Sequence, residues 1–142
     1  MNAYKVLRDR QQAEVNAFPM MFAFSQKQFD EGMEKLGLKP TDTDKIYRLG
    51  NTGGYYRKTD SEALRDMFER HAKEMEEAVE ADKTGEGFIF DMFNYELANH
   101  EYGYTHEVED ALNALGLTVE DVNGDARMRK ALAKAVKCQR RC

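Results

Sequence analysis

The sequence has few residues that break or cross-link a chain, and it has no long apolar run. Only two of its 142 residues are proline and two are cysteine, Cys138 and Cys142, near the C-terminal end. Their spacing fits neither a metal knuckle nor a disulfide framework, so we expect a reducing environment. The longest apolar stretch, near Phe18–Phe24, is too short to cross a membrane. Because a polar segment also follows Met1, we expect a cytoplasmic protein and no secretion.

Catalytic motifs are also lacking. The chain has no G-x-S-x-G, no H-E-x-x-H and no cysteine beside a histidine that could act as a nucleophile. The glycine-rich stretch Gly50–Gly54 joins two strand-like segments, whereas a phosphate-binding loop would lead into a helix and carry Gly-Lys-Ser/Thr. We therefore expect a protein that is not an enzyme and that has no cofactor.

The composition predicts one folded α+β domain over residues 1–142. Hydrophobic residues make up 42% of the chain and aromatic residues 11%, which is enough for a core. The pattern predicts about three short antiparallel strands covered by five or six helices. The strands are expected near residues 20–24, 45–49 and 55–58, with a hairpin turn at 50–54. The helices are expected at residues 3–17, 26–36, 59–81, 88–100, 108–115 and from 125 onward.

The sequence holds three capping boxes, pairs of side chains that satisfy free backbone donors at a helix start, and two of them begin predicted helices. The pairs are Ser25 with Gln28, Thr59 with Glu62, and Thr118 with Asp121. Gly37 is expected to end the second helix in the left-handed conformation. These signals predict helix boundaries independently of the hydrophobic pattern.

Charge is sorted along the chain. Residues 60–110 hold 16 Asp and Glu against 4 Lys and Arg, whereas residues 1–59 and 111–142 are net positive. The formal net charge of −5 therefore hides an acidic centre between two basic ends. Because charge patterns determine association more than fold, this feature concerns partners.

On the predicted helix 59–81, carboxylates recur at steps of three and four and so share one face. This acidic row can imitate the phosphates of a nucleic acid, because one helical turn rises about 5.4 Å. The simpler alternative is a solvated face that serves solubility. The residues proposed to bind a partner are Glu62, Asp66, Glu69, Glu76, Glu77 and Glu80.

A basic stripe lies on the last predicted helix and includes Arg127, Lys130, Lys134, Lys137 and Arg141. Three interpretations stay open: compensation of the helix dipole, contact with phosphates, and docking on an acidic face of the same or a second copy. Since exposed aromatic residues do not interleave with the cations and the protein is net acidic, direct nucleic-acid binding is not expected. The oligomeric state stays open, a homo-oligomer included.

The histidines suggest an alternative site. Glu96 and His100 are one helical turn apart, and Glu101 and His106 follow closely, so these four residues could hold a metal ion. A metal-binding helix would show a second histidine on the face of His100, which the sequence lacks. We favour a partly buried Glu–His pair instead, and we expect His71 at the edge of the core.

Two stretches resemble a family of small uncharacterised proteins found in Firmicutes and in their phages and mobile elements. They are Phe22–Gly32, with the sequence FAFSQKQFDEG, and Tyr95–Tyr102, with the sequence YELANHEY. The resemblance covers most of the chain, including the Gly53-Gly54 turn and residues 111–118. It implies a setting, that of an accessory protein, and carries no assigned catalytic residue.

The expected function is that of a non-enzymatic protein-binding module. In its sharper form, the hypothesis is an inhibitor from a phage or mobile element that acts as anti-CRISPR proteins do. Its acidic surface would compete with nucleic acid for a basic host protein, such as a nucleic-acid-binding effector. The alternative is a small metal-binding protein or metal-dependent enzyme that uses Glu96, His100, Glu101 and His106.

Overall fold

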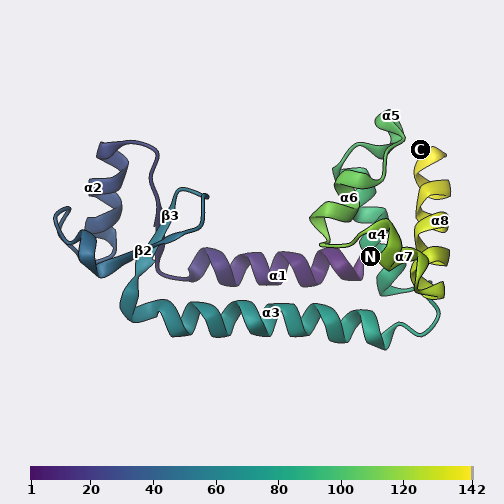
Figure 1. Ribbon diagram of the computed structural model, residues 1–142, viewed down its shortest axis with the longest axis horizontal. Helices are drawn as coiled ribbons and strands as arrows, with labels where there is room; N and C mark the ends of the chain where they lie inside the picture. The colour runs from purple at the N-terminus through teal and green to yellow at the C-terminus, as the bar shows by residue number, and fades with distance from the viewer. Residues whose placement is uncertain (142) are drawn as a thin grey trace. The chain divides into compact units, whose positions relative to one another are not determined.

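The computed structural model describes residues 1–141 and shows an α+β fold. The described residues form eight α-helices, two short 3-10 turns and one three-stranded antiparallel sheet (Figure 1). The elements, in chain order, are α1 (Ala3–Ala17), β1 (Met20–Phe22), α2 (Gln26–Lys35), η1 (Thr43–Lys45), β2 (Ile46–Leu49), β3 (Gly54–Arg57), η2 (Lys58–Asp60), α3 (Ser61–Ala81), α4 (Phe88–Asn99), α5 (Tyr102–Thr105), α6 (Glu109–Ala114), α7 (Val119–Asn123) and α8 (Ala126–Arg140).

The contacts divide the chain into two compact units. The sheet unit is Ala13–Ala72, and the helical unit combines Met1–Gln12 with the chain from Lys73 onward. Helices α1 and α3 contribute residues to both units. The single domain expected over residues 1–142 stays a prediction, and each unit is described by itself below.

The sheet unit contains the three predicted strands in the order β1-β3-β2. Met21 lies opposite Tyr55, and Tyr47 lies opposite Tyr56. The β2–β3 turn uses the positive φ angles that its glycines allow, +53° at Gly50 and +80° at Gly53. The predicted hairpin is therefore confirmed, and β1 pairs antiparallel with the other edge of β3.

Two small apolar clusters stabilise the sheet unit, one on each face of the sheet. Met21, Met33 and Leu36 form the first cluster, with the rings of Phe29 and Tyr55 packed edge to face 5.4 Å apart. The second cluster contains Met20, Leu64 and Met67, so the predicted apolar stripe of α3 is buried here. The two clusters account for the alternation of side chains along β1 and β3.

The cap of α2 differs in one bond from the predicted capping box. Ser25 Oγ accepts the backbone N–H of Gln28 at 3.2 Å, as expected. Gln28 Oε1, however, accepts the backbone N–H of Phe24 at 2.7 Å rather than that of Ser25. The Gln28 side chain thus bonds one residue further toward the N-terminus than a capping box requires, in the segment that follows β1. Gly37 follows with a φ of +75°, as the sequence predicts.

The helical unit has one core around α4. Ile89, Met92, Phe93 and Leu97 are buried, as the periodicity predicts, and α4 packs against α8. Helix α8 can approach closely because its buried positions include Ala131. Helices α5 and α6 also pack against α4, and α7 packs against α8.

Helix starts in the helical unit follow the sequence closely. Thr118 and Asp121 form the predicted reciprocal capping box, and Asp125 caps α8 by accepting the N–H groups of Arg127 and Met128. Two boundaries differ from expectation. In the sheet unit, a 3-10 turn occupies Lys58–Asp60, so α3 begins at Ser61 rather than at the predicted Thr59–Glu62 capping box, and in the helical unit α5 occupies Tyr102–Thr105, where no helix was predicted. Short helices of four residues give little periodic signal.

Candidate functional site on helix α3

Helix α3 presents the predicted acidic row to solvent. It is 21 residues long, and its buried side chains, Leu64, Met67 and His71, lie on the opposite side from the carboxylates. All six residues proposed to bind a partner are exposed. We call them the acidic face: Glu62, Asp66, Glu69, Glu76, Glu77 and Glu80. The structure therefore places these side chains together on one element, as the helical spacing predicts.

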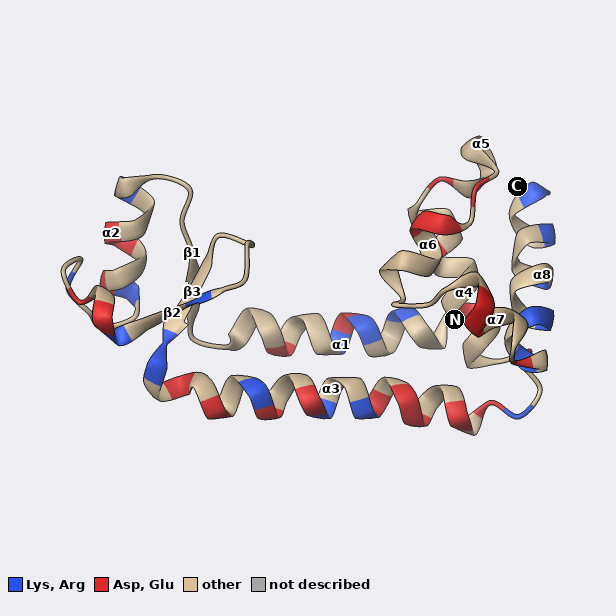
Figure 2. Ribbon diagram, viewed as in Figure 1, with Lys and Arg blue, Asp and Glu red and all other residues tan. Residues whose placement is uncertain are grey.

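Cations interrupt the acidic face more in its first half than in its second. Arg65 and Arg70 are exposed on α3, and Arg70 pairs with Glu14 of α1 at 3.0 Å. Lys73 lies within the row, and its ammonium is 3.9 Å from Glu77. The densest part of the acidic face is thus its C-terminal end, from Glu76 to Glu80. Figure 2 shows this density of carboxylates at that end of α3.

The acidic face is largely unpaired with the basic stripe of α8. Glu80 lies 3.9 Å from Arg127, and this carboxylate is 69% exposed, so the pair contributes little to stability. Lys130 reaches Glu86, which lies outside the row, at 3.4 Å. Within residues 1–141, no ion pair forms at Glu62, Asp66, Glu69 or Glu76. Among residues 73–141, the acidic face and the basic stripe therefore form one ion pair, between Glu80 and Arg127.

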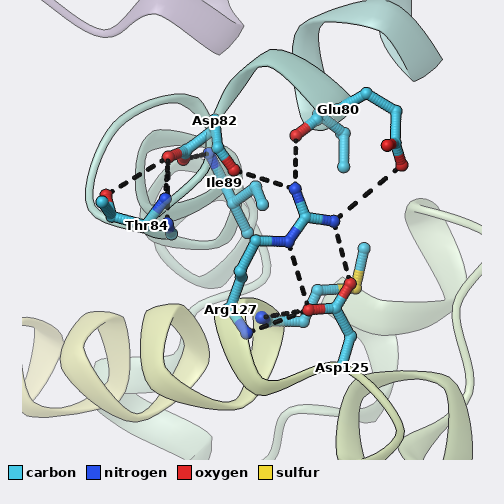
Figure 3. A network of polar contacts seen from close by, with 9 residues as sticks. Glu80, Asp82, Thr84, Ile89, Asp125 and Arg127 are labelled. Atoms are coloured by element: carbon cyan, nitrogen blue, oxygen red, sulfur yellow. Dashed lines mark hydrogen bonds and ion pairs between the residues drawn. The ribbon is translucent and has the colours of Figure 1, made fainter.

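Arg127 connects the end of α3 to the start of α8 (Figure 3). Its Nη1 donates hydrogen bonds to the carbonyl oxygens of Val79, at 3.1 Å, and Asp82, at 2.8 Å. Its Nη2 donates to Asp125 at 3.0 Å. Because carbonyls at the end of a helix lack intrahelical partners, the half-buried guanidinium is well suited to satisfy them. Arg127 is thus committed to structure and differs from the other cations of the stripe.

The carboxylate of Asp82 organises the loop between α3 and α4. It accepts the backbone N–H groups of Gly85 at 2.9 Å, Gly87 at 3.1 Å and Ile89 at 2.9 Å. Burial raises the pKa of this carboxyl, but the backbone hydrogen bonds outweigh it and hold the pKa below the ordinary value. The acidic face therefore ends at a tightly bonded loop.

The residues of the alternative metal site are not brought together. Glu96 is only 2% exposed, and its Oε2 accepts the hydroxyl of Tyr4 at 2.8 Å. His100 is the half-buried C-cap of α4, whereas Glu101 and His106 are exposed and left-handed, with φ values of 58° and 60°. No three His, Cys, Asp or Glu side chains within residues 1–141 form a group that could hold a metal ion. The expected Glu96–His100 pair is wrong, because the carboxylate of Glu96 points into the core and its hydrogen-bond partner is Tyr4.

Two polar pairs were not apparent from the sequence. The Tyr4–Glu96 bond joins residues 92 positions apart, and burial together with the Glu96 carboxylate raises the pKa of Tyr4. His71 is buried, as expected, and it bonds to Glu14, whose pKa the histidine and Arg70 lower. The only signal in the sequence is that Tyr4 and His71 both fall on apolar helix faces.

The structure is a helix-rich α+β fold with a charged face on α3. None of the described helices is both long and apolar enough to cross a membrane. A model of a family of unknown function, DUF7659, matches residues 3–138, and the chain belongs to that family. No curated protein and no solved structure gives a significant match. The membership agrees with the expected resemblance to an uncharacterised family.

Proposed function

We propose that this protein is a non-enzymatic binding module whose acidic face contacts a basic surface on another protein. The observation that supports this most is that the six carboxylates are exposed on one helix while four of them have no ion pair within residues 1–141. Like charges on one helix face disfavour the helix slightly, so local stability does not explain the row. A partner that supplies cations to these carboxylates would explain the row.

The partner that fits best is a protein with a groove for nucleic acid. Such grooves present lysine and arginine side chains that neutralise regularly spaced phosphates. A rigid helix that repeats carboxylates at each turn offers these cations a substitute at fixed spacing. In its sharper form, the proposal is that of an inhibitor from a phage or mobile element that blocks a nucleic-acid-handling defence protein, as anti-CRISPR proteins do.

The test is a charge reversal at three positions of the acidic face, Glu69→Lys, Glu76→Lys and Glu80→Lys together. A matched control reverses three exposed carboxylates elsewhere, Glu31→Lys, Glu34→Lys and Glu107→Lys, and changes the net charge equally. Circular dichroism checks that both variants remain folded. The tagged wild-type protein and both variants are used to capture proteins from a host lysate, and duplex DNA is then added as a competitor.

We expect the wild type and the control to capture the same basic protein and the face variant to lose it. Duplex DNA should release that protein, because DNA and the acidic face would occupy one groove. Capture that survives the reversal on α3, or that DNA does not affect, contradicts the proposal.

A further inference from the structure

Helix α8 has an exposed side made only of cations and alanines. Within Ala126–Arg140, every exposed residue is lysine, arginine or alanine. No Asp or Glu occurs from Ala126 to Arg141. We call the exposed cations of this segment the basic face: Arg129, Lys130, Lys134, Lys137, Arg140 and Arg141. Figure 2 shows the blue positions repeating along α8.

The helical unit neutralises little of the basic face. Lys130 is 3.4 Å from Glu86, but both side chains are more than half exposed. The ammonium of Lys134 lies 4.9 Å from the centre of the Phe90 ring. Arg129, Lys137, Arg140 and Arg141 form no ion pair with any residue in 1–141. The charges thus remain available on the surface.

Helix stability does not account for these cations. Lysine and arginine in the last turn favour a helix because they complement its dipole, which explains Lys137 and Arg140. Arg129 and Lys130 lie near the opposite end, where the dipole disfavours positive charge. Cations at steps of three and four also repel one another. Because these cations lower the stability of their own helix, they suggest an anionic ligand.

We propose that the basic face of α8 binds the phosphate backbone of double-stranded nucleic acid. Lysine is depleted in protein–protein interfaces and aromatic residues are enriched there, so a lysine-rich face without aromatics fits phosphates better than a protein. The alanines Ala126 and Ala133 let the helix approach a backbone closely. Contacts to phosphates carry no sequence information, so we expect binding that does not depend on sequence.

This inference is independent of the proposed function, and it goes against the expectation that the protein does not bind nucleic acid directly. Association responds to the local arrangement of charge. The net charge of −5 is a sum over the whole chain, and the excess of Asp and Glu lies between residues 60 and 110. If four cations neutralise phosphates, affinity should fall roughly 100-fold between 50 and 200 mM salt, since each contact releases a counterion.

The experiment measures fluorescence anisotropy of a labelled 20-base-pair DNA duplex with the full chain at both salt concentrations. Two duplexes of different sequence test sequence dependence. The variant Lys130→Gln, Lys134→Gln, Lys137→Gln removes three charges of the basic face. A matched control, Lys27→Gln, Lys39→Gln, Lys83→Gln, removes three exposed charges elsewhere. Circular dichroism verifies the fold of each protein.

We expect both duplexes to bind equally, the α8 variant to bind at least tenfold more weakly and the control to stay within twofold. The reversal of Glu69, Glu76 and Glu80 should not weaken this binding, which separates the inference from the proposed function. Absence of binding at 50 mM salt, or an α8 variant that binds normally, overturns it. A third result also overturns it: the protein does not bind DNA but self-associates, and the α8 variant abolishes that self-association. The ligand of the basic face would then be a second copy of the chain.

Discussion

The hydroxyl of Tyr4 donates a 2.8 Å hydrogen bond to Glu96 Oε2 inside the core of the helical unit. The other carboxylate oxygen, Oε1, is buried and accepts no hydrogen bond from any residue in 1–141. A buried polar atom without a partner is costly, so the single bond from Tyr4 matters more than an exposed one would. This pair makes α1 and α4 interdependent.

Removal of the Tyr4 hydroxyl should destabilise the protein. Tyr4→Phe retains the ring, which packs 5.9 Å from Phe88, but leaves both oxygens of Glu96 without a partner. We expect a loss of about 1–3 kcal/mol in the free energy of unfolding, measured by urea denaturation. The double variant Tyr4→Phe, Glu96→Leu should recover part of that loss, because no buried polar group then remains. A double variant less stable than Tyr4→Phe contradicts this account.

Arg127→Ala should be the most damaging change among the cations of α8. It removes the guanidinium hydrogen bonds to the carbonyls of Val79 and Asp82 and to the carboxylate of Asp125. We expect thermal or urea unfolding to show a loss of about 2–3 kcal/mol. Arg129→Ala is the matched control, since this exposed side chain has no ion pair in the described chain and should change stability by less than about 0.5 kcal/mol. Equal effects of the two substitutions are inconsistent with the Arg127 contacts.

Stability should depend on acid pH through Asp82. Its pKa in the folded state is below the ordinary value of 3.8, so the ionised form stabilises the fold above about pH 4. That contribution is lost as the pH falls through the lowered pKa. In Asp82→Asn, one side-chain oxygen becomes an amide nitrogen, which cannot accept a backbone N–H. We expect this variant to be less stable than the wild type at pH 7 by about 1–3 kcal/mol. The difference between the two proteins in urea midpoints should narrow toward pH 2, and a constant difference argues against this role.

Gly85 should tolerate substitution poorly. Its φ is +82°, and a Cβ at this position would collide with the backbone carbonyl of Arg127. Gly37 has a similar φ, +75°, but open space around it. Gly37→Ala therefore measures the cost of the conformation, about 1 kcal/mol, and Gly85→Ala should exceed it clearly because the Arg127 backbone must also move. Comparable melting temperatures for the two variants contradict the predicted collision.

Local signals in the chain were strong enough to predict most of the elements. The apolar periodicity of Phe88–Asn99 and the cap at Asp125 needed no information from distant residues. The start of α3 and the four-residue helix α5 were missed, because short turns depend on the surrounding packing rather than on a repeat. The reach of Gln28 to Phe24 likewise depends on where β1 ends.

The sequence by itself determined that acidic and basic residues would each gather on one helix face, because helical spacing converts a repeat of three and four into a surface. It could not determine whether those faces pair with each other, since that depends on the packing of α3, α4 and α8. Only the tertiary structure shows Arg127 bound to the end of α3, Glu96 bound to Tyr4 and the remaining charges exposed. The physical reason is that hydrogen bonds and ion pairs between distant residues require positions in space, which a local pattern does not contain.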